Sequence, residues 1–509
     1  MQVVPQNGRI SYSTISRTLD SSERGETDAP EGRSLSALSG SIGRISCLLK
    51  ANLFFVLLFL FGAVVRVAVS FAYQPALLLQ RDTYAYLNQA LEPAPGGFRP
   101  AVYPLILKGL LIFDNLVVVT VIQHLAGLGI GLLLYLLLRR VGVGASLAAL
   151  GSAPILLDAY QIDIEHFILT EAFFESFIVI ALALLMWNKR PSIPATAVAG
   201  ILLAFSGLTR FVGVGLIAPA LLYVLIRRVG WLRGAALVVG FALPLVVHAS
   251  WSGVGGQGLG LTNRNGYFLY GRVASFADCT GMQLREEIRR FCFEIPPSER
   301  GPNYGFFTLD VPRFEDERRG NALLLEFSTT MIRRQPLDYA RVVATDLLRF
   351  FDPSAPIERE PFVKRWRFVG SLEEADPHPL VVRRGGSPPR ISGVDQEFRI
   401  DRPLASKLLA YQDVFYVYGP LLALMLVLGT IGSLVGAPIR GRDLRAECAL
   451  LTLSALALLL PPVMATVYHF RYTIPALAVA GPAGALGAAV LWARYFRHFD
   501  QRRLRRALL

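Results

Sequence analysis

Long uninterrupted apolar stretches constrain the fold of this chain more than any other feature. Residues 52–72, 116–138 and 167–187 are each close to the roughly 20 apolar residues that a helix needs to cross a bilayer. Of the 509 residues, 53% are hydrophobic and 17% charged, with a mean hydropathy of +0.45, and such a chain is suited to lipid. Longer stretches can each form two short spans, so we predict an all-α polytopic membrane protein with about ten helical spans. These longer stretches are residues 141–187, 193–226 and 448–492.

Basic residues occur in short clusters between the apolar stretches. The formal net charge is +13, but no single polar stripe collects it, so nucleic acid is not an expected partner. The positive-inside rule explains the clusters, because loops that stay in the cytoplasm are rich in Lys and Arg. We therefore expect a multi-pass protein of the plasma membrane with both termini in the cytoplasm. The clusters lie at Arg44 and Lys50, Lys189 and Arg190, Arg227 and Arg228, and in the tail after residue 493.

The predicted spans divide the chain into five parts. One of them, residues 252–404, is large enough to form an extracytoplasmic domain, either α or α+β. Within it, Cys279 and Cys292 are close enough in sequence to form a disulfide if the domain lies outside the cell. The parts are a disordered cytoplasmic tail (1–46), an N-terminal transmembrane module (47–251), the extracytoplasmic domain (252–404), C-terminal transmembrane helices (405–493) and a basic cytoplasmic tail (494–509).

Carboxylates interrupt the apolar pattern on the predicted outer side. Asp82 follows the first span and could act as a general base, or it could pair with Arg81 or cap a short interfacial helix. Asp158, Asp163 and Glu165 belong to the tip of the second outer hairpin. Asp158 and Asp163 are either functional or solvated loop charges. Glu171 falls inside the next span, where an ionisable group is either functional or paired at the helix end.

Arginines end two spans on the same side. Arg210 and Arg471 could each hold a phosphate through paired hydrogen bonds, although snorkelling to lipid headgroups would also explain them. The sequence has no Walker A pattern and no dinucleotide-binding glycine fingerprint that follows a strand. It also lacks a Gly-x-Ser-x-Gly elbow and a CxxC metal framework. We therefore expect no required cofactor and assign no metal ligand, and a role for a divalent metal is left open.

The membrane portion resembles the GT-C superfamily of polytopic glycosyltransferases, especially the group with protein O-mannosyltransferases and lipid A aminoarabinose transferases. The resemblance covers residues 50–230 and 405–495 and does not extend to 252–404. It rests on the order and shared sidedness of several short motifs. These are Arg81-Asp82-x-Tyr84, Arg99-Pro100-Ala101-Val102-Tyr103-Pro104-Leu105, Ile168-Leu169-Thr170-Glu171, Leu208-Thr209-Arg210 and Arg471-Tyr472-x-x-Pro475.

The resemblance implies an inverting transfer of a hexose or pentose from a polyprenyl-phosphate donor to an acceptor hydroxyl, on the extracytoplasmic side of the membrane. It makes Asp82 the base and makes Arg210, Arg471 and Tyr472 the candidates for holding the donor phosphate. The acidic residues of the second outer loop, Asp163, Glu165 and Glu171, become candidates for ordering that loop or the acceptor. Thr83 stands where many protein mannosyltransferases have a second acidic residue, which counts against protein mannosylation.

The implied partners are the donor, membrane lipids and an acceptor that is a glycan, a lipid or a protein, in the synthesis of envelope glycans or glycoconjugates. Two functions from other classes compete with this one. A transporter or lipid-linked-sugar flippase would also need many spans with a few charges, and a scaffold would not need Asp82.

Overall fold

A computed structural model of the chain describes residues 52–78, 80–93, 99–254, 260–262, 264–300, 304, 314–354, 367–370 and 399–496. The predicted N-terminal tail (1–46) and most of the predicted C-terminal tail lie outside these residues, as does much of the region from 355 to 398.

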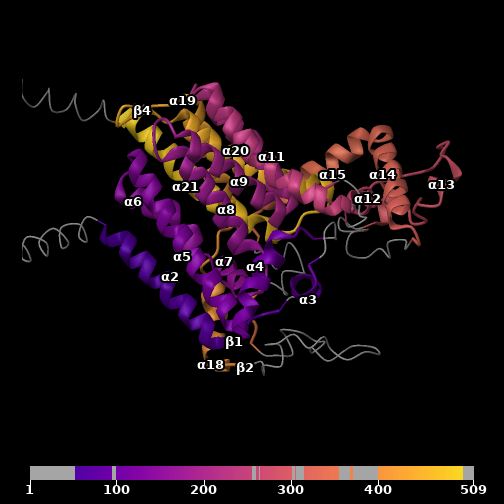
Figure 1. Cartoon of the computed structure of the whole chain (residues 1–509), viewed down its shortest axis with the longest axis horizontal. Helices are drawn as coiled ribbons and strands as arrows, with labels where there is room; N and C mark the ends of the chain where they lie inside the picture. The colour runs from indigo at the N-terminus through magenta and orange to yellow at the C-terminus, as the bar shows by residue number, and fades with distance from the viewer. Residues whose placement is uncertain are drawn as a thin grey trace, which may run out of the picture. The chain divides into compact units, whose positions relative to one another are not determined.

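Membrane-length helices dominate the described residues (Figure 1). Five helical segments are long and apolar enough to cross a bilayer, and shorter apolar helices accompany them. The prediction of an all-α polytopic membrane protein is thereby confirmed. The long helices are α2 (Leu53–Ala72), α5 (Leu116–Val141), α11 (Trp231–Val254), α20 (Arg445–Ala465) and α21 (Thr473–Leu491). The shorter ones include α4 (Val102–Leu110), α6 (Ala145–Leu157), α9 (Ile193–Thr209), α10 (Ile217–Ile226) and α19 (Gly419–Val435). Helix α8 (Glu171–Met186) packs against α9.

Loops with basic residues meet at one end of the helix bundle, which we call the basic end and define by Arg139, Lys189, Arg227 and Arg440. Lys189 Nζ donates to the carbonyl of Gly441 at 3.0 Å, and Arg227 Nη2 donates to the carbonyl of Lys189 at 2.9 Å. Arg440 Nη1 reaches the carbonyl of Arg139 at 3.3 Å. A short hairpin of β3 (Pro438–Ile439) and β4 (Arg442–Asp443) lies here. In Figure 1 it is far from β1 (Tyr73–Gln74), which pairs with β2 (Arg399–Ile400) near the other end.

The hairpin predicted for residues 141–187 contains an additional buried helix, α7 (Ala159–His166), between α6 and α8. Asp158 starts α7 because its Oδ1 accepts from the backbone N–H of Gln161 at 3.0 Å. Its Oδ2 accepts from the backbone N–H of Val417 at 2.6 Å. All eight residues of α7 are buried, so the interpretation of this tip as solvated is wrong. Backbone donors replace the water that a loop carboxylate would otherwise need.

Helix α21 packs deep inside the bundle because its small residues let neighbouring backbones approach closely. A Cβ at Gly487 would lie 2.0 Å from the carbonyl oxygen of Leu428 in α19. A Cβ at Gly481 would lie 2.6 Å from the carbonyl oxygen of Gly151 in α6. This packing fixes the start of α21, where the short helix η6 (Phe470–Tyr472) carries Arg471.

The polar domain, which we define as the described part of residues 260–354, is helical. Its helices are α12 (Asn265–Val273), α13 (Glu286–Arg289), α14 (Glu317–Arg334) and α15 (Pro336–Leu348). Helices α14 and α15 are separate because Pro336, which has no backbone N–H, cannot continue the hydrogen-bond ladder of α14. The core of this domain includes Tyr270, Phe291 and Phe327.

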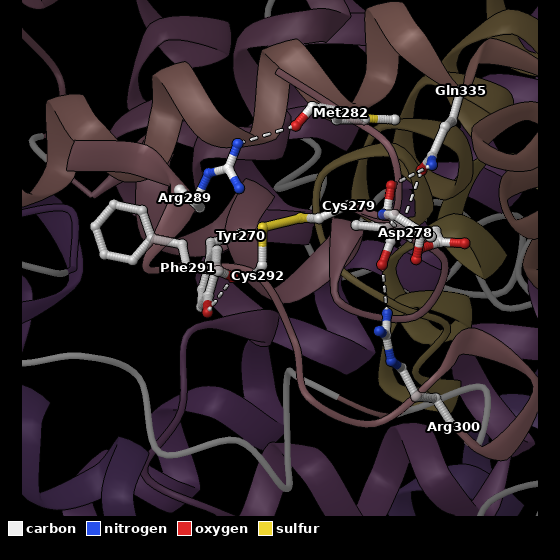
Figure 2. Close-up of a disulfide and its surroundings, with 11 residues drawn as sticks. Tyr270, Asp278, Cys279, Met282, Arg289, Phe291, Cys292, Arg300 and Gln335 are labelled. Atoms are coloured by element: carbon white, nitrogen blue, oxygen red, sulfur yellow. Dashed lines mark hydrogen bonds between the residues drawn. A yellow bond between two sulfur atoms is a disulfide. The ribbon is translucent and has the colours of Figure 1, made fainter. Parts of the chain in front are cut away.

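A disulfide joins Cys279 to Cys292 beside this core, with an S–S distance of 2.02 Å. Figure 2 shows Tyr270 and Phe291 on one side of it and the chain around Asp278 on the other. Gln335, at the end of α14, donates from Nε2 to the carbonyl of Asp278 at 2.7 Å. The pairing that the sequence left open is therefore present in the structure.

Candidate active site

Five charged side chains from distant parts of the sequence meet in what we call the charge cluster: Asp82, Arg99, Glu171, Arg210 and Arg471. Asp82 lies in the first turn of α3 (Gln80–Leu91), and Arg99 precedes α4. Glu171 is the first residue of α8, Arg210 caps the end of α9, and Arg471 lies in η6. Each stands where a helix starts or ends, so its charge is at the rim of the bundle instead of its middle.

Asp82 accepts hydrogen bonds from two arginines. Arg99 Nη2 donates to its Oδ1 at 2.5 Å, and Arg471 Nη1 donates to its Oδ2 at 2.6 Å. Burial alone would raise the pKa of Asp82, but the attraction of Arg471 and Arg99 outweighs it and lowers that pKa to about 2. Asp82 is therefore ionised, and with 23% of its side chain exposed it is the most accessible residue of the charge cluster.

Glu171 anchors the other side of the charge cluster and is fully buried. Arg471 binds it with two nitrogens, Nη2 donating to Oε2 at 2.9 Å and Nε donating to Oε1. Arg210 donates to the same Oε1. The position at the N-terminus of α8 adds the favourable helix dipole. One carboxylate thus aligns two guanidinium groups, and Arg471 bridges Glu171 to Asp82.

Aromatic rings and a histidine surround the arginines. The Cζ of Arg210 lies 5.8 Å from the ring centre of Tyr472, and that of Arg99 lies 4.8 Å from the ring centre of Tyr86, within the range of cation–π attraction. His469 Nδ1 accepts from the backbone N–H of Arg471 at 3.2 Å. Burial and the nearby positive charge of Arg471 lower the pKa of His469 to about 3, so His469 is neutral and shapes the turn that carries Arg471.

The structure separates two predicted residues from the charge cluster. Glu165 is fully buried between Arg66, whose Nη2 donates to its Oε1 at 2.8 Å, and His124, whose Nδ1 lies 3.0 Å from its Oε2. Asp163 is 1% exposed, and among the described residues neither of its carboxylate oxygens has a hydrogen-bond partner. Both residues help build the interior around α7, and neither contacts the five residues of the charge cluster.

Sequence reasoning missed two arginines of functional interest. Arg99 is part of the motif of residues 99–105 but is not a predicted site residue, although it forms one of the two ion pairs of Asp82. Arg66 lies inside the first span, where a charge is costly without a partner, and that signal was available from the sequence alone. In the described part of the chain, no group of three or more His, Cys, Asp and Glu side chains is arranged to hold a metal ion.

The lowered pKa of Asp82 predicts how its ion pairs depend on pH. Because the folded-state pKa lies below the ordinary value of 3.8, the pairs stabilise the fold fully above that value and are lost as pH falls toward 2. We expect the difference in Tm between the wild type and Asp82→Asn to be constant from pH 5 to pH 8. Thermal unfolding in detergent across this range measures it. A difference that shrinks between pH 6 and pH 5 would contradict the assigned pKa. The control is Asp338→Asn, which alters a carboxylate with 51% of its side chain exposed.

Comparison with known proteins bears on the membrane portion. Residues 103–237, about a quarter of the chain, match the family of dolichyl-phosphate-mannose-protein mannosyltransferases. The matched segment includes Glu171 and Arg210. The match confirms the predicted resemblance to GT-C glycosyltransferases in this part of the sequence. No curated protein matches the chain.

Three solved structures show a distant likeness. One is the protein O-mannosyltransferase complex of S. cerevisiae bound to the sugar donor, at 16% identity and a TM-score of 0.34, covering 48% of this chain and 37% of that one. Another is the Archaeoglobus fulgidus oligosaccharyltransferase in complex with an inhibitory peptide and a dolichol-phosphate. Its sequence identity is 15% and its TM-score 0.38, and the alignment covers 90% of this chain and 52% of that one. The third is the oligosaccharyltransferase of the same organism tethered to an acceptor peptide. Its sequence identity is 15% and its TM-score 0.37, and the alignment covers 91% of this chain and 51% of that one. This chain spans about a third to a half of their lengths.

Proposed function

We propose that this polytopic membrane protein, which resembles the GT-C glycosyltransferases, transfers a sugar from a polyprenyl-phosphate donor to an acceptor hydroxyl. The match over residues 103–237 supports the class of enzyme, since that family is named for a sugar carried on a lipid phosphate. The charge cluster supports the type of donor, as described next.

The observation that carries the proposal is the charge balance of the cluster. Three arginines and two carboxylates leave these five side chains with one net positive charge. A sugar linked to a lipid through one phosphodiester carries one negative charge, so its phosphate would neutralise the cluster. Guanidinium groups suit this task because their planar donors match phosphate oxygens in pairs. Glu171 would keep Arg210 and Arg471 aligned for that phosphate before it arrives.

The role of Asp82 follows from its arginine partners. A carboxylate with a pKa near 2 is a poor base, because a general base works best with a pKa nearer the operating pH. A donor phosphate would draw on the same guanidinium groups of Arg471 and Arg99 and weaken their hold on Asp82. The pKa of Asp82 would then rise toward its ordinary value. Donor binding would thus prepare the base.

The proposed reaction is a direct displacement. The acceptor oxygen attacks the anomeric carbon and its proton moves to Asp82, while the bond from that carbon to the phosphate oxygen breaks. The bonding electrons leave with the lipid phosphate, whose growing charge Arg471 and Arg210 stabilise. Attack opposite the leaving group inverts the configuration of the sugar. Because the lipid phosphate is itself the leaving group, no nucleotide is needed at this step.

We propose that the reaction takes place on the extracytoplasmic side of the plasma membrane. Two observations support this side. Helix α8 runs from Glu171 toward Lys189 and α9 runs back to Arg210. The basic end therefore lies at the opposite end of these helices from the charge cluster, as the positive-inside rule requires if the basic end is cytoplasmic. The Cys279–Cys292 disulfide favours an oxidising compartment for the polar domain. The acceptor is a glycan, a lipid or a protein.

The test is transfer by the purified protein in lipid vesicles, with radiolabelled polyprenyl-phosphate sugars as donors and envelope fractions as acceptors. We expect label to move from the donor to a new product, and heat-treated protein to give none. If label crosses the vesicle membrane but stays on the donor, the chain is a flippase and the proposal is wrong. If intact protein neither transfers nor translocates any donor of a sugar panel, the proposal is also wrong.

A further inference from the structure

A buried ion pair links two helices of the polar domain. Arg272 in α12 donates from Nη1 to Oδ2 of Asp346 in α15 at 2.6 Å. Their side chains are 1% and 3% exposed, so the pair is shielded from water. Burying two charges is costly, and a buried ion pair is weak evidence for stability by itself. What the pair contacts is therefore more informative than its strength.

Both members of this pair also bind the backbone of the loop between α20 and η6. Arg272 Nη1 donates to the carbonyl of Thr466 at 3.2 Å. The backbone N–H of Tyr468 donates to Asp346 Oδ2 at 3.1 Å. The pair therefore holds the loop at two points only two residues apart. The ring of Tyr468 also contacts two residues that follow α15. Its centre lies 4.9 Å from the ring centre of Phe350 and 4.6 Å from the Cζ of Arg349.

The same loop leads directly to the charge cluster. Arg471 follows Tyr468 by three residues and divides its donors between Glu171 and Asp82. Thr466 caps the end of α20 and its backbone N–H donates to the carbonyl of Pro462 at 2.7 Å. Residues 467–469 belong to no helix, so no regular hydrogen-bond ladder fixes their path. The contacts from Arg272 and Asp346 supply part of that constraint from outside the membrane bundle.

We propose that Arg272 and Asp346 are positioning residues, which hold the loop of residues 466–469 so that Arg471 reaches both carboxylates and the donor phosphate. The effect on the donor rests on the proposed function, but the effect on the loop does not. The polar domain would therefore set the geometry of the phosphate site. A shift of about 1 Å in such a group is enough to cost a large factor in rate.

Hydrogen exchange tests the positioning without any donor. We expect the peptide amides of residues 466–472 to exchange at least tenfold faster in Asp346→Asn than in the wild type. The double variant Arg272→Gln/Asp346→Asn, which leaves no lone buried charge, should show the same. The control Glu326→Gln breaks an ion pair with Arg285 on the same domain and should leave these amides unchanged. If the amides of residues 466–472 exchanged at the wild-type rate in both Asp346→Asn and Arg272→Gln/Asp346→Asn, the proposal would be overturned.

Transfer kinetics test the consequence for the site. A smaller folded fraction would lower the apparent kcat without altering KM, so KM for the donor is the informative quantity. We expect Asp346→Asn to raise this KM at least fivefold. In an Arg471→Lys background the same substitution should change KM less than twofold, because both changes act through one guanidinium group. If Asp346→Asn raised KM by the same factor in the Arg471→Lys background as in the wild type, the two residues would act independently and the proposal would be overturned. Absence of transfer by the wild type would instead overturn the proposed function and leave the exchange result standing.

Discussion

Replacing Asp82 by Asn should lower kcat for sugar transfer at least about 100-fold, because a positioned general base contributes roughly 10²–10⁴ in rate. Asn keeps the size of the side chain but cannot accept the acceptor's proton. It also weakens the ion pairs with Arg99 and Arg471, which leaves more positive charge in the charge cluster. Donor binding should therefore persist or tighten while turnover collapses. Steady-state kinetics and direct binding of the labelled donor separate these two effects.

The matched control for this prediction is Asp338→Asn, which removes the same charge from an exposed position of α15 and should leave kcat unchanged. If the wild type and Asp82→Asn transferred sugar at equal rates, Asp82 would not be the general base. Loss of donor binding in the variant would mean that Asp82 chiefly shapes the phosphate site.

Replacing Arg471 by Lys should lower kcat/KM for the donor by about 10²–10³, a loss comparable to that of one preorganised donor group at a developing anion. Lysine keeps the positive charge, but it cannot contact Glu171 with two nitrogens and reach Asp82 with a third. Because the charge remains, the two carboxylates keep a cationic neighbour. The fold should survive, as size-exclusion chromatography in detergent would show.

Arg341→Lys is the matched control, because the side chain of Arg341 is 79% exposed and does not contact the charge cluster. Kinetics with both variants over a range of donor concentrations measure the effect. A full rate in Arg471→Lys would show that a point charge suffices at this position, which would contradict the role given to the guanidinium fork.

The spans could be predicted because apolar length is a local property of the sequence. Each of the three clearest stretches, residues 52–72, 116–138 and 167–187, contains most of a helix. The internal structure of the second hairpin could not be predicted, because α7 is buried through its neighbours. The polarity of Asp158 indicates a loop, but the backbone N–H groups of Gln161 and of Val417, 259 residues away, make its burial tolerable.

The residues of the charge cluster were easier to predict than their pairing. Asp82, Glu171, Arg210 and Arg471 each stand out as a charge at the edge of an apolar stretch. That Arg471 joins Asp82, 389 residues earlier, to Glu171, 300 residues earlier, follows only from the packing of α21. Glu165 carries the same local signal and yet lies elsewhere, because Arg66 provides a partner inside the bundle.

The Arg66–Glu165 pair also bears on how the chain is made. Arg66 enters the membrane with α2, and an unpaired arginine near the centre of a span costs about 2.5–3.5 kcal/mol. Its partner lies 99 residues further along and is synthesised roughly 5–20 s later at ordinary rates of translation. Until then α2 would hold Arg66 by bending its side chain toward the headgroups or by shifting in the bilayer. The buried contact between α2 and α7 can thus form only after Glu165 has been synthesised, so this part of the bundle assembles in a fixed order.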